Sequence, residues 1–245
     1  MPESTLADTR PARQFLLIPG FMCDASLWKF MLPGFEQLGQ VHFADLNEGN
    51  SIEDMATRLL PVLPDKAIII GFSLGGYVAR RLTWLALQQG KAINGLVLLN
   101  TSARASTADE DNKNRQQIKL LEHYPYKGQT MTALRRVLHP QRQDETVMLA
   151  HLQAMSLALG KQVFLQQLSI ARADGHHELP EITCPALVVA SRNDQMRSLA
   201  ESEKLANGLP HSTLHIIEDC GHMSPLEKAP ELITTLHGWL QQHAI

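Results

Sequence analysis

Six short runs of apolar and β-branched residues recur along this chain, and helical patterns lie between them. Each run has about the length of one strand, and several are apolar throughout, as expected for strands buried on both faces of a parallel sheet. Because strands alternate with helices, the sequence predicts βαβ units with right-handed crossovers, and therefore an α/β fold with a mostly parallel central sheet flanked by helices. The expected strands are QFLLI (14–18), VHFAD (41–45), AIII (67–70), GLVLL (95–99), ALVVA (186–190) and TLHII (213–217).

Three helices can be placed from their patterns. Within residues 52–60 the apolar positions repeat at helical spacing, Ser51 stands as an N-cap before an acidic first turn, and Pro61 closes the helix. A second helix is expected over about 74–88, and the last over about 231–242. Only about a dozen residues precede the first strand, too few for an initial antiparallel hairpin, so we expect a sheet of six or seven strands.

One segment breaks the alternation of strands and helices. From about residue 104 to 178 the sequence shows only Gln-, Leu- and Ala-rich helical stretches. We therefore expect a core formed by 1–103 and 179–245, with a helical cap inserted over 104–178. An apolar stripe in this insertion could line a pocket, but such stripes at helical spacing favour simple packing. The stripe consists of Leu149, Leu152, Met155, Leu157 and Leu159.

Composition narrows the class of protein and its partners. The 245 residues are 44% hydrophobic and 19% charged, which is typical of a globular protein with a full core. The formal net charge is −3 and no dense basic block occurs, so no nucleic-acid partner is expected. Residues 1–15 are polar and lack the apolar centre of a secretory signal, and no run approaches the ~18 residues of a membrane span. We expect a cytoplasmic protein without a membrane span; nothing in the sequence indicates its oligomeric state.

The cysteine pattern points away from disulfides and metals. Cys23, Cys184 and Cys220 are odd in number and have no Cys-x-x-Cys or other metal-ligand spacing. Reduced thiols in a reducing compartment fit this pattern, and structural zinc does not. Cys23 and Cys220 lie close in sequence to candidate site residues, but neither has a dedicated base, so we interpret both as small buried residues.

The most informative motif is Gly71-Phe72-Ser73-Leu74-Gly75, between the strand AIII and a helical pattern. A glycine on each side of the serine removes side chains that would clash where a strand reverses sharply into a helix. The serine hydroxyl would then stand at the carboxyl end of a central strand, near a helix N-terminus. A Gly-x-Ser-x-Gly string alone is weak evidence, but this strand–turn–helix context predicts that Ser73 is a nucleophile.

A serine nucleophile needs a base, and the base needs a carboxylate to orient it. Among the eleven histidines we select His222, because it lies in a glycine-containing loop between the last strand and the final helix. Asp194 lies in the loop that follows the strand ALVVA and is the preferred carboxylate. Asp219 is the rival, but three residues before the histidine it is expected to cap the strand end or the turn. The chain order Ser73, Asp194, His222 is that of α/β-hydrolases.

Acyl transfer also needs N–H donors for the oxyanion. One is usually the residue after the nucleophile, here Leu74. The second is expected after the first strand, where Gly20 lets the backbone turn so that the N–H of Phe21 can face the serine. Both assignments rest on the position of the residue in the chain, because a backbone N–H donor cannot be recognised from the identity of its side chain.

These motifs together resemble the α/β-hydrolase superfamily, in particular its single-domain, helical-cap members. The resemblance covers nearly the whole chain through four segments in the same order. One departure is Pro19-Gly20, where many relatives have His-Gly. The four segments are LLIPGF…LW, GFSLGG, CPALVVASRND and IIEDCGHMSPLEKAPEL.

The resemblance implies a carboxylic ester as the substrate bond, cleaved through an acyl-enzyme. A serine triad with an oxyanion hole supplies nucleophile, proton transfer and charge stabilisation, so no cofactor or metal is expected. The expected partner is a small-molecule ester. A thioesterase, a lactonase or a C–C bond hydrolase would use nearly the same residues, and a receptor-like protein could bind a small molecule with this fold without turnover.

Overall fold

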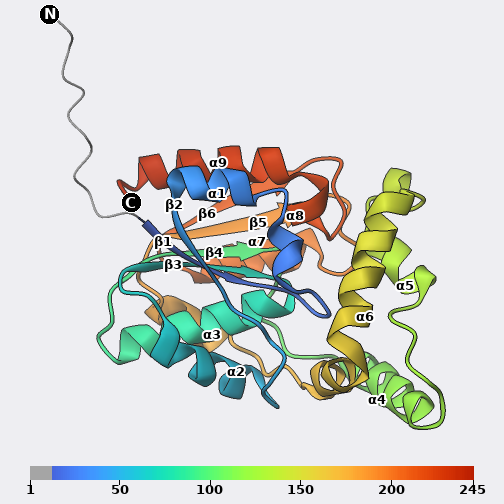
Figure 1. Ribbon diagram of the computed structural model, residues 1–245. Coiled ribbons are helices and arrows are strands. Elements are labelled where there is room, and N and C mark those ends of the chain that lie inside the picture. The colour runs from blue at the N-terminus through green and yellow to red at the C-terminus, as the bar shows by residue number, and fades with distance from the viewer. Residues whose placement is uncertain (1–12) are drawn as a thin grey trace, which may run out of the picture.

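The structure is a computed structural model that describes residues 13–245, in which six parallel strands form one sheet in the order β2-β1-β3-β4-β5-β6 (Figure 1). The prediction of an α/β fold with a parallel sheet of six or seven strands is confirmed. The sequence predicts neither a secretory signal nor an initial hairpin, and both of these expectations concern residues before position 13, outside the described residues. The strands are β1 Arg13–Ile18, β2 Gly39–Phe43, β3 Ala67–Phe72, β4 Ile93–Leu99, β5 Ala186–Ser191 and β6 Ser212–Ile217.

Two apolar layers cover the sheet, because successive side chains of a strand point to opposite faces. In β1, Phe15 and Leu17 pack into one layer while Leu16 and Ile18 pack into the other. Helices α1 and α9 cover the first face, and α2, α3 and α7 cover the second (Figure 1). The bounds are α1 Leu32–Leu38, α2 Ile52–Leu59, α3 Leu74–Gln88, α7 Leu199–Gly208 and α9 Ala229–Gln242.

The predicted helix boundaries follow local sequence signals. The Ser51 hydroxyl accepts a hydrogen bond from the amide of Asp54 at 3.0 Å and caps α2, which ends just before the 3₁₀ turn η2 Leu60–Val62. Helix α3 has the predicted bounds, and α9 begins two residues before the predicted start. Helices α1 and α7 are additional to the predicted ones. Helix α7 begins with a capping box between Ser198 and Glu201, a signal that is present in the sequence.

Residues 104–178 contain helices and no strand, and all of them are described. We call them the helical segment. It stands beside the edge of the sheet at which the strands end (Figure 1). Gly160, with φ 78°, breaks its longest helix. Its elements are α4 Ala108–His123, α5 Met131–Arg136, α6 Thr146–Ser169 and the 3₁₀ turns η3 Pro140–Arg142 and η4 His176–Glu181.

The apolar stripe of the helical segment packs mainly against the core, as expected. Leu149, Leu152 and Met155 are buried in the same layer as α1 and α9. Leu159 is only partly buried, in a smaller cluster, and Leu157 is 51% exposed, so the stripe is shorter than the sequence pattern indicates. The break at Gly160 ends the helical register of the stripe one residue after Leu159.

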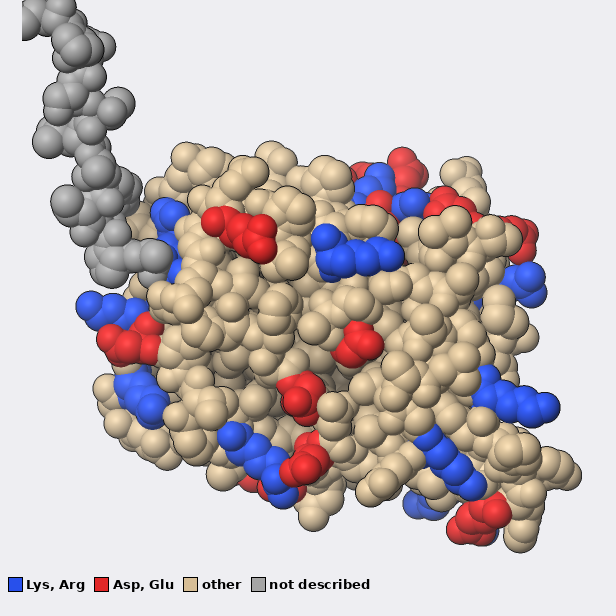
Figure 2. Space-filling view, viewed as in Figure 1, with Lys and Arg blue, Asp and Glu red and all other residues tan. Residues whose placement is uncertain are grey.

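Charged side chains of both signs are scattered over the face shown in Figure 2, without a continuous patch of either sign. Over residues 13–245, no helix has both the length and the apolar character needed to cross a membrane.

Candidate active site

Ser73 occupies a strained turn between β3 and α3. Its backbone has φ 51° and ψ −112°, a conformation that non-glycine residues rarely adopt. Two hydrogen bonds hold it there: the Ser73 amide donates to the Leu99 carbonyl at 2.9 Å, and the Thr101 hydroxyl donates to the Ser73 carbonyl at 2.7 Å. The turn places Ser73 in the lining of the cavity described below.

Close backbone packing explains the glycine after the serine. A Cβ at Gly75 would lie 2.2 Å from the carbonyl oxygen of Pro19 and 2.4 Å from that of Ile18. Backbone atoms cannot yield at such distances, so a larger residue would push the first turn of α3 away from the loop after β1. This loop and the serine turn therefore form one packed unit.

Ser73, His222 and Asp194 form a continuous chain of hydrogen bonds. The serine Oγ lies 2.9 Å from His222 Nε2, and His222 Nδ1 lies 2.7 Å from Asp194 Oδ2. Ser73 is 9% exposed and His222 is 5% exposed. The histidine ring also packs against Phe72, with 5.1 Å between ring centroids. The structure thus brings together the three residues selected from the sequence.

Several donors converge on the Asp194 carboxylate. Asn100 donates to its Oδ2 at 3.0 Å, and the backbone amides of Met196 and Arg197 donate to Oδ1 at 2.7 and 3.0 Å. Burial is the largest single influence on this group and favours the neutral acid. His222 and the hydrogen-bond donors together outweigh burial and lower the pKa of Asp194 below its usual value.

Asn100 is a site residue that the sequence reasoning missed. It follows β4 directly, has φ 47°, and is 1% exposed. Besides Asp194 it donates to Ser191 Oγ at 2.9 Å, and it accepts from Ser224 Oγ at 2.5 Å. A polar residue directly after an apolar strand was the available signal.

Asp219, the rival carboxylate, is exposed and has φ 47° in the turn after β6. The hydrogen bonds of the His222 ring in the described part of the chain go to Ser73 and Asp194 and not to Asp219.

The histidine loop is bonded to the helical segment. The His222 amide donates to the Val137 carbonyl at 2.8 Å. Glu227, at the end of α8 Ser224–Glu227, accepts from the amide of His139 at 2.9 Å and from that of Met223 at 3.2 Å. Burial raises the pKa of Glu227 despite these donors. The position of the histidine therefore depends on residues that are 85 positions away in the chain.

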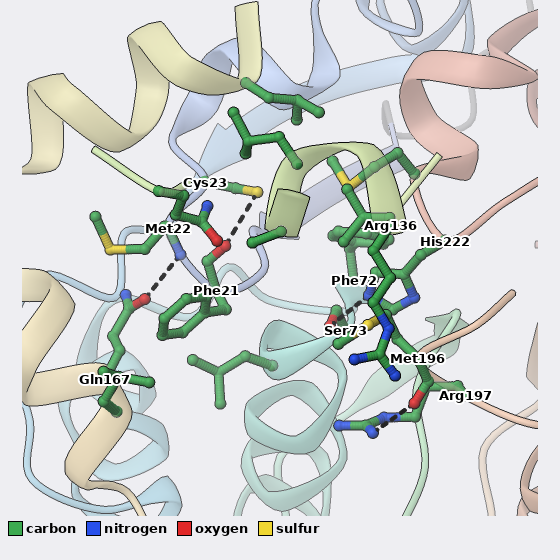
Figure 3. Close-up of a pocket in the computed structure, with 18 of the residues that line it drawn as sticks. Phe21, Met22, Cys23, Phe72, Ser73, Arg136, Gln167, Met196, Arg197 and His222 are labelled. Atoms are coloured by element: carbon green, nitrogen blue, oxygen red, sulfur yellow. Dashed lines mark hydrogen bonds between the residues drawn. The ribbon is translucent and has the colours of Figure 1, made fainter. Parts of the chain in front are cut away.

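The loop after β1 reaches the serine from the other side. A Cβ at Gly20 would lie 2.7 Å from the Phe72 ring and 3.3 Å from the Ser73 Cβ, so the absence of a side chain permits this approach. The Met22 amide donates to Gln167 Oε1 at 2.8 Å, and Gln167 also donates to the Leu46 carbonyl at 3.0 Å (Figure 3). Gln167, from α6, thus fixes the loop that carries Phe21.

A cavity of about 320 Å³ opens above Ser73 and His222, between the core and the helical segment. Phe21 and Leu74, the expected oxyanion donors, both line it. Of the apolar stripe only Leu152 reaches it. The sequence reasoning missed the polar lining from the helical segment and the loop after β5, because no local motif marks those residues. This polar lining includes Glu110, Gln129, Arg136, Gln167, Arg172 and Arg197.

The cysteines near the site are buried thiols. Burial first, and the negative charge of Asp24 second, raise the pKa of Cys23 to about 12. Burial likewise raises the pKa of Cys220 to about 12. A thiol with such a pKa is protonated at neutral pH and is a poor nucleophile. This agrees with the interpretation of both residues as space-filling.

A parallel sheet, a serine on a strained strand-to-helix turn, and a histidine and an aspartate from later loops define a hydrolase of the α/β class. Residues 15–235 match the model of the alpha/beta hydrolase family. The chain belongs to this family.

Known members of the family with related sequences or structures include esterases and a lactonase. The chain is 24% identical, over 93% of its own length and 94% of the relative, to a pimeloyl-[acyl-carrier protein] methyl ester esterase of Vibrio atlanticus. Among solved structures it resembles a thermophilic esterase from Thermogutta terrifontis, with a TM-score of 0.80, 22% identity and coverage of 96% and 92% of the two chains. It also resembles an enol-lactonase from Burkholderia xenovorans, with a TM-score of 0.77, 22% identity and coverage of 96% and 94%.

Proposed function

We propose that this protein is a serine hydrolase that cleaves a carboxylic ester through Ser73, His222 and Asp194. The observation that carries the proposal is the unbroken hydrogen-bond chain from Ser73 Oγ through the His222 ring to Asp194, at the floor of a cavity. The family and its esterase relatives support a hydrolytic reaction.

In the acylation step, Ser73 Oγ attacks the ester carbonyl carbon while His222 Nε2 accepts the hydroxyl proton. The C–O bond to the alcohol breaks as the tetrahedral intermediate collapses, and His222 returns the proton to the leaving alkoxide. Asp194, ionised and held by its donors, fixes the histidine tautomer and stabilises the imidazolium. Water then attacks the acyl-enzyme with His222 again as base, and a carboxylic acid leaves.

The oxyanion is held by the amides of Leu74 and Phe21. Leu74 begins α3, so its N–H is one of the amides that lack a partner inside the helix, and the helix N-terminus favours negative charge. The loop that carries Phe21 packs against Ser73 through Gly20 and is tied to α6 through Gln167. The Pro19-Gly20 sequence keeps the backbone donor on this loop.

The test is steady-state hydrolysis of p-nitrophenyl esters with acyl chains from two to twelve carbons, comparing the natural protein with Ser73→Ala. We expect turnover that the substitution lowers by at least about 10³-fold, because a triad acts as a unit. Unchanged unfolding temperature of the variant is the control for folding.

The same site could attack a thioester, a lactone or a C–C bond, so thioester and lactone substrates belong in the panel. Turnover that survives Ser73→Ala would contradict the proposal. Tight small-molecule binding without turnover on any substrate would favour the receptor-like alternative.

A further inference from the structure

The charged lining of the cavity is unequal in sign. Three arginines line it, Arg136 at the end of α5, Arg172 after α6 and Arg197 after β5, against one carboxylate, Glu110 on α4. The face in Figure 2 shows mixed charges, so the accumulation of arginines is a property of the cavity lining and not a continuation of a basic patch on that face.

The single carboxylate is already neutralised by other partners. Arg104, which lies outside the cavity lining, donates to both oxygens of Glu110 at 2.7 and 2.8 Å, and Arg172 donates to Oε2 at 3.0 Å. The hydrogen bonds from Arg104 hold the pKa of Glu110 well below its usual range, so it is ionised and fully engaged. Arg104 also pairs with Glu201, so Arg104 and Arg172 balance these two carboxylates.

Of the other two arginines of the cavity lining, Arg136 has no acidic partner in the described part of the chain and Arg197 has only a long ion pair with Glu110. Among residues 13–245, the side chain of Arg136, an exposed residue at the rim of the cavity, makes no hydrogen bond and no ion pair. Arg197 donates to the Met196 carbonyl at 2.8 Å, but its nearest carboxylate oxygen, on Glu110, is 3.8 Å away. Figure 3 shows both guanidinium groups on the side of the cavity where Ser73 and His222 lie.

Unused donors are concentrated near Arg197. Its side chain is only 10% exposed, yet its Nε has no hydrogen-bond partner among the described residues. The same holds for Arg172 Nε. The Tyr77 ring lies 5.8 Å from the Arg197 guanidinium and 5.5 Å from that of Arg172, and its hydroxyl is also unpaired among the described residues, although Tyr77 does not line this cavity. Buried polar groups normally have partners, so a set of unpaired donors beside a cavity is suited to an acceptor brought by a ligand.

We propose that Arg136 and Arg197 bind a carboxylate on the substrate, so that the enzyme prefers esters that carry a free carboxylate to neutral esters of the same size. Guanidinium groups bind carboxylates through paired, charge-assisted hydrogen bonds, and apolar residues that line the same cavity, such as Phe72 and Leu74, suit a methylene chain between the carboxylate and the ester. This inference rests on the proposed hydrolase function and assigns its substrate class.

The test compares kcat/KM for monomethyl adipate with that for methyl hexanoate, which has a methyl group in place of the free carboxylate. A second pair, 6-acetoxyhexanoate and hexyl acetate, carries the carboxylate on the alcohol side. We expect at least one carboxylate-bearing ester to be preferred over its neutral partner, and Arg136→Gln to lower that preference by about 10- to 100-fold, as expected for loss of a charge-assisted hydrogen bond. The pair that shows the preference identifies whether the arginines bind a carboxylate on the acyl part or on the alcohol part of the ester.

Arg135→Gln is the matched control. Arg135 is the preceding residue of α5, makes an exposed ion pair with Asp144 at 3.4 Å, and does not line the cavity. Its substitution removes the same charge from the same helix and should leave the preference unchanged. Equal losses in both variants would indicate a general electrostatic effect and overturn the assignment of Arg136.

A binding measurement separates this inference from the proposed function. Calorimetric titration of adipate into Ser73→Ala needs no turnover, and Arg136→Gln in that background should weaken binding about 10-fold or more. Neutral esters cleaved as well as their carboxylate-bearing partners, with no adipate binding, would overturn the inference and leave the hydrolase standing. If adipate binds to Ser73→Ala and Arg136→Gln abolishes this binding, but the natural protein cleaves no ester, the proposed function is overturned and the anion site stands. Competition by phosphate as strong as by adipate would replace the carboxylate assignment with a phosphate one.

Discussion

The core and the helical segment contribute to one site in different ways. The core supplies Ser73 and Asp194 from turns at the ends of the fully buried strands β3 and β5, and His222 from the loop after the mostly half-buried strand β6. The helical segment supplies cavity walls, and its first helix, α4, has no buried residue. The core fixes the proposed reacting groups through packing, whereas the helical segment adds polar contacts to the site, such as that of Gln167, besides apolar side chains such as Leu152.

This difference predicts where substitutions act. A change in the core should alter the chemical step by orders of magnitude. A change in the helical segment should alter substrate choice, positioning or local stability by smaller factors. The contacts from Val137 to the histidine loop and from Gln167 to the loop after β1 are the two places where the regions overlap.

The largest effect expected from the comparison is that of Asp194→Asn. The carboxamide cannot hold the histidine tautomer that accepts the serine proton, so kcat should fall by about 10⁴-fold, as in other serine triads. Steady-state ester hydrolysis measures this. Asp219→Asn, on an exposed aspartate in the turn before the histidine, is the control and should change kcat less than about twofold. If the Asp219 variant shows the larger loss, Asp219 and not Asp194 orients the histidine.

The fold and the proposed catalytic residues could be predicted from the sequence because their signals are local. Apolar runs of strand length predict the sheet, and the glycine after Ser73 is required by the nearby carbonyl of Pro19. Asp194 and His222 were found because the loops after consecutive strands of a parallel sheet meet at one edge. Asn100 satisfies the same rule and could have been found by applying it to β4.

The helical segment could not be read in this way. Arg136 and Gln167 are ordinary polar residues in helical stretches, and only the tertiary packing of α5 and α6 brings them to the cavity. A stripe of apolar residues predicts that a helix packs, but it does not predict against which surface. Leu157 shows the limit, because the stripe pattern includes it and yet it is exposed.

Gln167→Met tests the overlap between the two regions. The substitution keeps the length of the side chain but removes the acceptor for the Met22 amide and the donor to Leu46. The loop after β1, which carries the proposed oxyanion donor Phe21, then loses its hydrogen bond to α6. We expect kcat to fall about 10-fold with a smaller change in KM, because the oxyanion forms only in the transition state.

Gln166→Met is the matched control for that variant. Gln166 is the neighbouring residue of α6 and donates to the Gly49 carbonyl instead of contacting the loop. Its loss should leave kcat nearly unchanged. Equal effects of the two substitutions would mean that α6 as a whole, and not the contact to Met22, supports the reaction.

The smallest effect concerns stability of the helical segment and is measured by unfolding at two pH values. Glu110 joins Arg104 to Arg172, and its pKa is lowered chiefly by the hydrogen bonds from Arg104. A carboxyl with a lower pKa in the folded state stabilises that state fully at pH values above the pKa of the unfolded chain, near 4.5. This contribution is lost as the pH falls further towards the pKa of the folded state. Glu110→Gln should therefore lower the free energy of unfolding by about 1–2 kcal/mol at pH 7 and by progressively less below pH 4. Urea unfolding of both proteins at pH 7 and pH 3.5 measures the two differences. A deficit that stays constant between these values would mean that Glu110 acts through packing and not through its charge.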